Sequence, residues 1–382
     1  MNDRKRTVLV VQRILPHYRT GFFRLLREQL QSESVELRLV AGQERVGTVP
    51  ASVTLPDDWV TRTENRYLAV GGVELCWQPV VRMSADFDLV ILEQANRLMA
   101  NHLVQAQRRL HGRPVAFWGH GTNFQQRGRF SINEMVKRQL LRQVDWWFAY
   151  TRVSADMLSA RGFPRERITV VENTIDSREF QRAMNAVTAA DIATARASMK
   201  LQPGPVGLFC GGMYQEKKLG FLVDACVAIR QAVPNFQMLW IGHGPEQRLV
   251  EAACRSHDWM RYLGSITGRD RAVYFALSEA ILMPGAVGLV IVDSFNAARP
   301  IFTARHDLHG PEIAYLENGR NGIMSRLDVG DYAKDVVTFL RDPAMMAAIR
   351  EGCRRSAATY SLENMVERFA DGILNCLRRS PP

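Results

Sequence analysis

Short, unbroken apolar runs recur through the first half of the chain, separated by polar loops and helical patterns. Such a run is typical of a parallel strand that is buried on both faces of its sheet. Helical spacing begins at Phe22, after the first run, and also fills residues 95–110. This alternation predicts a doubly wound α/β domain. Its strands are expected at residues 8–11, 35–40, 89–92, 115–118, 145–150 and 168–171.

A second series of the same kind starts at residue 206. Its strands are expected at residues 206–210, 237–241, 260–263 and 280–283, and the C-terminal part is helical. Ser361 is a good N-cap for the last helix. The alanine-rich stretch before the second series ends in Gln-Pro-Gly-Pro, which indicates a crossover between two domains. We therefore expect a first domain at 1–180, a linker at 181–203, a second domain at 204–358 and a final helical segment at 359–382.

Glycines mark the strand ends of the second series, at 211–212, 242–244, 264 and 285–288. The last of these loops leads into a short helix from Leu289 that ends before Pro300. A strand, a glycine loop and a helix N-terminus together form an anion site, because free N–H groups and the helix dipole face outward. We expect a nucleotide-sugar diphosphate there, with Asp293 hydrogen-bonding a sugar hydroxyl. The alternative is an ordinary α/β connection with an exposed aspartate.

Polar residues also follow two strands of the first domain. His17, Tyr18 and Arg19 come after the first strand, and in an open parallel sheet the ligand crevice lies beyond the carboxyl ends of the strands. His120 stands between two glycines after the 115–118 strand. A histidine there is poorly placed for core packing, and its neutral ring can both donate and accept hydrogen bonds. We expect His120 to face a ligand; a loop-stabilising role is the alternative.

Composition and charge narrow the choice of partners. Apolar residues make up 47% of the chain and charged residues 23%, which suits a folded globular protein. The net charge is +10, and residues 97–167 hold 13 Lys and Arg against 4 Asp and Glu. This surplus predicts an anionic surface as a partner of the first domain, with a solvated basic face as the alternative. Nucleic acid is not expected, since no zinc-finger or RNP-type signature is present.

Three further patterns bear on where the protein works. Residues 132–142 form an amphipathic basic stripe that either lies on anionic lipid or buries its apolar side in the core. No apolar run approaches the roughly 20 residues needed to cross a bilayer, and the first apolar run lacks a signal-peptide cleavage site. The six cysteines show no paired or metal-binding spacing, which fits reduced thiols. We expect a cytoplasmic protein with peripheral contact to an anionic membrane.

The residues exclude several chemistries and favour one. No G-x-S-x-G, H-E-x-x-H or Walker loop is present. Asp86 and Asp88 form a D-x-D pattern, but they directly precede a strand, where aspartates commonly begin an element. Lys217 is a compact positive charge that can neutralise a leaving diphosphate, and an exposed helix start is the alternative for it. Breaking a sugar–phosphate bond through an oxocarbenium-like state needs stabilisation of the departing anion more than it needs a nucleophile.

Five ordered motifs make the C-terminal half resemble the family 4 glycosyltransferases of the GT-B fold. That fold places two Rossmann-like doubly wound domains on either side of a central cleft. The resemblance covers most of residues 206–358, and the N-terminal half matches more loosely. The motifs lie at 211–217, 239–245, 262–264, 284–300, and 310–313 with 318–322.

The resemblance implies a retaining, metal-independent transferase that uses a nucleotide-diphosphate sugar as co-substrate and needs no cofactor. By position, Lys217 holds the diphosphate together with the backbone N–H groups of Gly288 and Leu289. Asp293 takes the ribose hydroxyls, and His120 lies near the transferred sugar. The base is bordered by Gly242, His243, Gly264 and Ser265. The last helix is expected to cross back to the first domain.

We therefore expect a glycosyltransferase that acts on a lipid-linked or polysaccharide acceptor, with His120 and Lys217 as its catalytic residues. On the acceptor side it would use His17, Tyr18 and Arg19. One alternative is a sugar-nucleotide epimerase or hydrolase of the same architecture. Another is a binding subunit without activity.

Three positions depart from the family pattern. Gly212 stands where the family usually has Arg, Gly285 stands where it usually has Glu, and Asp293 replaces a longer Glu. Two interpretations remain open at this point. Either the sugar contacts have been rebuilt, with Glu312, His306 or His309 as candidates, or the site is degenerate.

Overall fold

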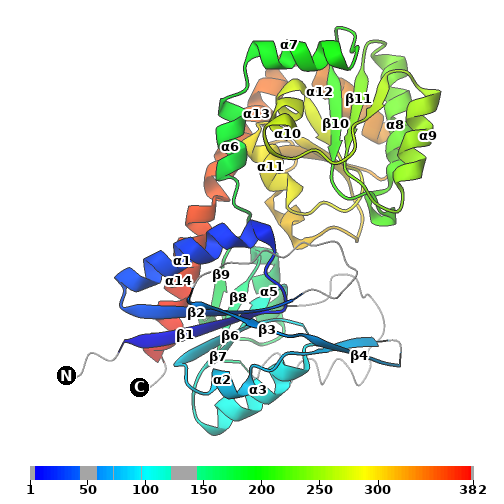
Figure 1. Cartoon of the computed structure of the whole chain (residues 1–382). Helices are drawn as coiled ribbons and strands as arrows, with labels where there is room; N and C mark the ends of the chain where they lie inside the picture. Colours follow the sequence, from blue (N-terminus) through cyan, green and yellow to red (C-terminus); the bar gives the residue numbers. More distant parts are fainter. Residues whose placement is uncertain (1–4, 44–57, 72, 96, 122–143, 380–382) are drawn as a thin grey trace. The chain divides into compact units, whose positions relative to one another are not determined.

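The chain folds into two compact units (Figure 1). In this computed structural model, residues 5–43, 58–71, 73–95, 97–121 and 144–379 are described. The first unit comprises Met1–Asp176 together with Leu362–Pro382, and the second comprises Ser177–Ser361. Each unit is built around its own parallel sheet.

The sheet of the first unit has the strand order β3-β2-β1-β6-β7-β8-β9, and every neighbouring pair is parallel. The strands are β1 (Arg6–Gln12), β2 (Val35–Gly42), β3 (Val60–Thr63), β6 (Leu89–Glu93), β7 (Val115–Gly119), β8 (Trp146–Ala149) and β9 (Ile168–Val170). All six predicted strands are present. The sequence pattern missed β3, which is short and has no buried position, so it lacks the apolar run that marks the others.

Helices cover both faces of this sheet. On one face, α1 (Thr20–Ser32) and α14 (Leu362–Arg379) share a core with alternate residues of β1 and β2. On the other face, α3 (Met99–Leu110) and α5 (Arg152–Ala160) pack on the remaining residues of β1 and β6. The short helix α2 (Val81–Ser84) lies beside α3, and a two-stranded ribbon joins β4 (Arg66–Val70) to β5 (Val73–Trp77).

The last helix returns to the first unit, as the resemblance implied. Phe369 of α14 stacks on Phe148 of β8, with ring centroids 4.2 Å apart. Asp88 has the structural role expected of it, since its carboxylate accepts a hydrogen bond from the amide of Thr7 at 2.8 Å. The helix expected at 95–110 begins only at Met99. The amphipathic stripe expected at 132–142 lies outside the described residues.

The sheet of the second unit has the order β12-β11-β10-β13-β14-β15, again parallel throughout. Its strands are β10 (Val206–Cys210), β11 (Gln237–Ile241), β12 (Met260–Tyr262), β13 (Ala280–Leu282), β14 (Ile301–Ala304) and β15 (Gly322–Ser325). Its helices are α6 (Arg178–Asn185), α7 (Ala189–Ser198), α8 (Leu219–Ala232), α9 (Gln247–Ser256), α10 (Gly268–Leu277), α11 (Val290–Asn296), α12 (Val329–Arg341) and α13 (Pro343–Thr359).

The stretch expected to link the domains, residues 181–203, instead contributes α6 and α7 to the second unit. Phe180 of α6 packs edge-on against Phe275 of α10, with centroids 5.1 Å apart. Thr188 and Asp191 form a capping box at the start of α7. No residue of α7 is buried, so its sequence carries no apolar stripe. This explains why the pattern there resembled a linker.

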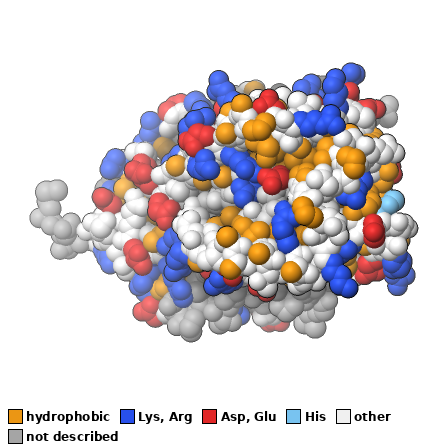
Figure 2. Space-filling view, turned by 90° about the horizontal axis from the view of Figure 1, so that it is seen from above, with side chains coloured by type: hydrophobic (Ala, Val, Ile, Leu, Met, Phe, Trp, Pro, Cys, Tyr) orange, Lys and Arg blue, Asp and Glu red, His pale blue; other side chains and the backbone are white. Residues whose placement is uncertain are grey.

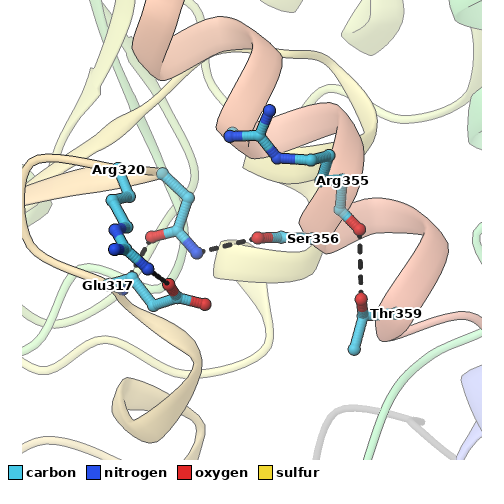
Figure 3. Close-up of a pocket in the computed structure, with 7 residues that line it drawn as sticks. Glu317, Arg320, Arg355, Ser356 and Thr359 are labelled. Atoms are coloured by element: carbon cyan, nitrogen blue, oxygen red, sulfur yellow. Dashed lines mark hydrogen bonds and ion pairs between the residues drawn. The ribbon is translucent and has the colours of Figure 1, made fainter.

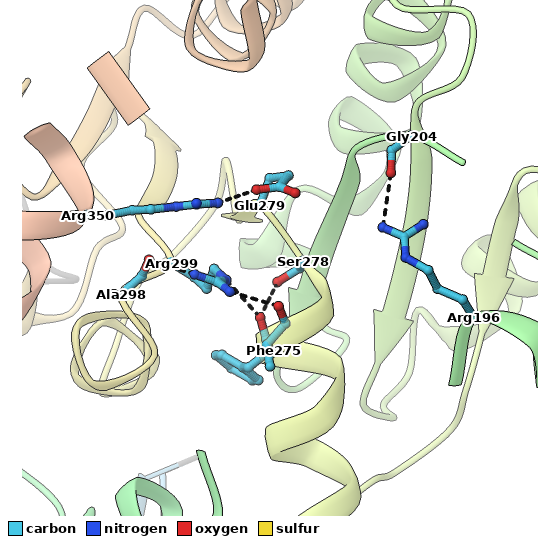
Figure 4. Close-up of polar contacts among 9 residues, drawn as sticks. Arg196, Gly204, Phe275, Ser278, Glu279, Ala298, Arg299 and Arg350 are labelled. Carbon is cyan, nitrogen blue, oxygen red and sulfur yellow. Dashed lines mark hydrogen bonds and ion pairs between the residues drawn. The ribbon is translucent and has the colours of Figure 1, made fainter. Parts of the chain in front are cut away.

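Arginine side chains fix the ends of helices in the second unit (Figure 4). Arg299, which follows α11, donates from Nε to the Phe275 carbonyl at 3.1 Å and from Nη2 to the Ala276 carbonyl at 2.8 Å. It thereby satisfies the last carbonyls of α10, as cationic side chains commonly do at helix C-termini. Arg350 of α13 pairs with Glu279, just before β13. These contacts hold α10, α11 and α13 around the sheet.

Across the described part of the chain, every helix is too short or too polar to traverse a bilayer.

Candidate functional site

Four glycine-containing loops lie side by side at the carboxyl edge of the second sheet. They follow β12, β11, β10 and β13, which are consecutive in that sheet. Backbone hydrogen bonds join each loop to the next: Gly242 N–H to Gly264 O at 2.8 Å, Met213 N–H to His243 O at 2.8 Å, and Ala286 N–H to Glu216 O at 2.8 Å. The row of glycine-marked loops expected from the sequence is therefore continuous along this edge.

At two positions in these loops, close contact with a neighbouring backbone requires a glycine. Gly242 has φ +136° and Gly244 has φ +153°, which L side chains rarely adopt. A Cβ on Gly242 would overlap the carbonyl oxygen of Gly211, and one on Gly244 would overlap that of Met213. The loops after β10 and β11 can touch only because neither position carries a side chain.

Lys217 lies in this row with its side chain buried. It ends the turn η3 (Gln215–Lys217), and only 5% of it is exposed. Its ammonium donates to the Ala286 carbonyl and lies 5.2 Å from the centre of the Tyr214 ring. Burial lowers the pKa of Lys217 to about 8. The alternative of an exposed helix start is therefore wrong, and Lys217 is a desolvated cation at a strand end.

Gly285 lies directly against the backbone that carries Lys217. A Cβ on Gly285 would overlap the carbonyl groups of Glu216 and Lys217. A larger residue at 285 therefore cannot coexist with the present position of Lys217. The absence of a glutamate here is thus linked to the close contact of the two loops, which fits a rearranged site better than an eroded one.

Replacing Gly285 by alanine is expected to destabilise the second unit by about 1–3 kcal/mol, the usual cost of forcing extra volume into a packed site. Gly288 provides the control, since a Cβ there meets no atom within 4 Å. Gly288→Ala should change the free energy of unfolding by less than about 0.5 kcal/mol. Urea unfolding of both variants, without ligand, measures the difference. Equal stability of the two variants would show that the loops are not in tight contact.

Two histidines and a glutamate brace the other side of the 284–288 loop. The Nε2–H of His309 donates to Ala304 O at 2.9 Å, so its Nδ1 accepts the amide of Val287 at 3.2 Å. Burial lowers the pKa of His309 to about 4, which keeps this neutral tautomer. His306 stacks on His309 with centroids 3.9 Å apart. The buried Glu312 side chain lies beside Gly310, whose amide donates to Val287 O at 2.8 Å.

Asp293 is buried and ion-paired rather than exposed. Its Oδ2 accepts from Arg271 of α10, and its side chain is 6% exposed. Burial raises the pKa of Asp293, and the Arg271 guanidinium opposes that rise. Oδ1 is buried without a partner in the described structure. The alternative of an ordinary exposed aspartate is therefore wrong.

The loops after β11 and β12 bring His243 and Ser265 together. His243 Nδ1 and Ser265 Oγ are 2.8 Å apart. Both residues are exposed. The Tyr262 hydroxyl donates to Gly242 O at 2.9 Å and ties these loops to each other. Gly212 is exposed at the neighbouring loop, where a Cβ would meet only the Tyr214 ring.

The candidate residues of the first unit gather at the carboxyl edge of their own sheet. Arg19 is buried, its guanidinium lies 4.2 Å from the centre of the Trp118 ring, and its Nη2 donates to Asn173 Oδ1 at 2.9 Å. The His120 ring lies 4.2 Å from that of Tyr150. Burial, and secondarily Arg19, lower the pKa of His120 to about 4. His17 is exposed and Tyr18 is half-buried.

Sequence reasoning missed three residues of these clusters, namely Arg271, Tyr150 and Asn173. Tyr150 ends the strand predicted at 145–150, and Asn173 lies two residues after the strand predicted at 168–171, so their positions near strand ends were a usable signal. Arg271 lies within α10, and nothing in its local sequence indicates that it pairs with Asp293.

A separate pocket of about 360 Å³ lies away from the glycine loops, between α13 and the turn before β15 (Figure 3). The buried Asn321 fixes this turn to α13, since its Nδ2 donates to Ser356 Oγ at 2.8 Å. Arg320 pairs with Glu317 at 3.3 Å. Gly352 allows the close approach, because a Cβ there would overlap the Arg320 carbonyl. The residues that line this pocket therefore also hold the turn before β15 against α13.

Solved structures with the same architecture define the class of protein. A glycosyltransferase from Rickettsia africae aligns with a TM-score of 0.71 at 13% identity, covering 99% of this chain and 100% of that one. Anabaena Alr3699/HepE in complex with UDP aligns with a TM-score of 0.70 at 16% identity, covering 97% and 99%. These alignments show that the chain has the GT-B fold, with two parallel α/β units.

Sequence comparisons give the family. Residues 204–342 match the family described as Glycosyl transferases group 1, and residues 23–179 match Glycosyltransferase Family 4. The chain belongs to the family 4 glycosyltransferases.

Two curated relatives illustrate the range of that family. The alpha-monoglucosyldiacylglycerol synthase of Acholeplasma laidlawii is 21% identical over 51% of this chain and 49% of its own length. The alpha-D-kanosaminyltransferase of Streptomyces kanamyceticus is 24% identical over 66% of each. The chain spans about half the length of the first of these relatives.

Proposed function

We propose that this protein transfers a sugar from a nucleotide-diphosphate donor to a lipid-linked or polysaccharide acceptor, with retention at the anomeric carbon and without a metal ion. The observation that carries the proposal is the buried Lys217, whose ammonium contacts the Ala286 carbonyl of the neighbouring loop. A desolvated cation suits a leaving diphosphate, because its charge acts more strongly away from bulk water.

On this proposal, the loops of the second unit bind the donor. Lys217 and the amides of Gly288 and Leu289 hold the diphosphate, and Asp293 Oδ1 accepts a ribose hydroxyl. The base borders the loops at Gly242 and Gly264, with His243 and Ser265. Gly212 leaves the side of the diphosphate open. Glu312, braced beside the 287–288 backbone, and His306 are the candidates for contacts to the sugar.

The reaction breaks the bond between the anomeric carbon and the phosphate oxygen and forms a bond from that carbon to an acceptor hydroxyl oxygen. The bonding electron pair leaves with the diphosphate, which gains negative charge, and the proton of the hydroxyl passes to that leaving group or on to water. Lys217 stabilises that charge, and the neutral His120 hydrogen-bonds the sugar or the acceptor. His17, Tyr18 and Arg19 contribute to the acceptor side. The enzyme works in the cytoplasm, with the basic first unit in contact with anionic lipid.

The test is release of nucleoside diphosphate from a panel of nucleotide sugars, with and without glycolipid and polysaccharide acceptors. The proposal expects release that depends on an acceptor and a product of unchanged anomeric configuration by NMR. It also expects activity to persist in EDTA. Consumption of donor without an acceptor would favour an epimerase or hydrolase instead. No donor-dependent thermal shift at all would indicate a binding subunit.

A further inference from the structure

The outer face of α3 in the first unit carries three large exposed apolar side chains among polar ones. Its inner face is buried through Ala100 and Val104. Its outer positions recur at helical spacing, and three of them carry large apolar side chains. These are Met99, Leu103 and Leu110, which are 39%, 50% and 85% exposed. A helix with apolar residues on both sides has a second face that its own unit does not cover.

The charges around this face are all of one sign along the helix. No Asp or Glu occurs between Arg97 and Arg113. Arg97 and Arg109 are exposed, and so is Arg82 on the neighbouring α2. Arg108 points inward instead, where it donates to four backbone carbonyls, so it contributes nothing to the surface. By contrast, Lys and Arg are interspersed with Asp and Glu on the face drawn in Figure 2.

We propose that the outer face of α3, with Leu103 and Leu110 inserted and Arg97 and Arg109 at the rim, docks on an anionic lipid surface. Exposed leucines flanked by arginines match the boundary between acyl chains and acidic headgroups. Figure 1 shows α3 and α2 together on one side of the first unit's sheet, so both can meet one plane. The inference rests on the proposed function, since a membrane contact brings the enzyme to a lipid-linked acceptor.

A second copy of the chain fits this face less well. In a two-fold dimer the same patch meets itself, which would bring the arginines of one copy against those of the other. Like charges placed opposite each other disfavour association. An acidic lipid surface supplies the missing counter-charge.

The experiment is co-sedimentation of the full-length protein with vesicles of phosphatidylcholine alone or mixed with phosphatidylglycerol. Leu103→Glu/Leu110→Glu should weaken binding to the anionic vesicles by about tenfold or more, because two apolar contacts become repulsive charges. Leu249→Glu/Leu327→Glu is the matched control, since these leucines of the second unit are 38% and 44% exposed. Arg97→Gln/Arg109→Gln should weaken binding and reduce its dependence on salt.

Loss of binding in the α3 variants but not in the control supports the proposal. Equal binding by wild type and Leu103→Glu/Leu110→Glu overturns it. A wild-type dimer that becomes monomeric in that variant, with vesicle binding unchanged, also overturns it and makes the face a subunit interface. Titration with nucleoside diphosphates is run in parallel. Suppose that no nucleoside diphosphate binds, while the α3 variants lose vesicle binding and the control variant keeps it. The proposed function is then wrong, and the membrane-docking role of α3 is still supported.

Discussion

Replacing Lys217 by methionine is expected to lower the rate of sugar transfer by about 10²–10³-fold, the range seen when one preorganised stabiliser of a developing anion is removed. Methionine keeps much of the length of lysine and fills the same buried space, so the loops after β10 and β13 should remain folded. The measurement is steady-state release of nucleoside diphosphate with the donor and acceptor that the wild type uses.

The neighbouring lysine is the control. Lys218 is only half-buried, and Lys218→Met should change the rate by less than about threefold, consistent with a weakly coupled surface charge. The wild type should also lose affinity for diphosphate as the pH rises above about 8, because the Lys217 ammonium then gives up its proton. That dependence should be absent in Lys217→Met. If Lys217→Met keeps the wild-type rate and the wild-type pH dependence, Lys217 has no role in the reaction.

Replacing Asp293 by alanine is expected to cost about 1–3 kcal/mol of stability, because it removes a buried carboxylate and leaves the half-buried Arg271 guanidinium without its charged hydrogen-bond partner. The ion pair joins α11 to α10 inside the second unit, so the effect should appear in urea unfolding without any ligand. Loss of nucleotide binding in this variant alone therefore does not isolate a ribose contact.

A double variant separates the two roles of Asp293. Arg271→Met/Asp293→Ala removes both charges and should recover most of the lost stability, since neither partner is left unpaired. It should still bind nucleotide more weakly than the wild type. The pair of Glu279 and Arg350 provides a comparison, because both side chains are about a quarter exposed, and Glu279→Ala should cost about 1 kcal/mol or less. If Asp293→Ala is as stable as the wild type, the ion pair does not form.

The parts of the fold that the sequence predicted are those with strong local signals. Most buried parallel strands carry apolar runs such as Val206–Cys210, and these runs allowed ten strands of the two sheets to be predicted. The strands β3, β14 and β15 were not predicted. Strand ends at one edge of a parallel sheet must meet, which is why glycines far apart in sequence could be grouped into one row. The break between Asp176 and Ser177 lies close to the boundary expected at residue 180.

The parts that the sequence missed depend on contacts between distant residues. Nothing near Gly285 indicates that its missing side chain makes room for the backbone of Glu216 and Lys217. The ion pair of Asp293 was not predicted, because its partner Arg271 is 22 residues away in another helix. The helix α7 was taken for a linker because it buries no residue. In each case the local sequence gave no signal for the contact, which depends on residues that are distant along the chain.

Two of the three departures from the family pattern, Gly285 and Gly212, have different physical settings. Gly285 is held in place by the loop that carries Lys217, and His306, His309 and Glu312 brace the adjoining backbone. Gly212 is exposed beside Tyr214. His309 and Glu312 are buried and His306 is half-buried. That these side chains rebuild the sugar contacts stays a prediction.

The most direct test is calorimetric titration of the wild type and Lys217→Met with a panel of nucleoside diphosphates that includes UDP. The account predicts that at least one of them binds the wild type and binds Lys217→Met at least about tenfold more weakly, a loss of about 1.4 kcal/mol. Binding of equal strength to both proteins, or no binding to the wild type by any member of the panel, would contradict it.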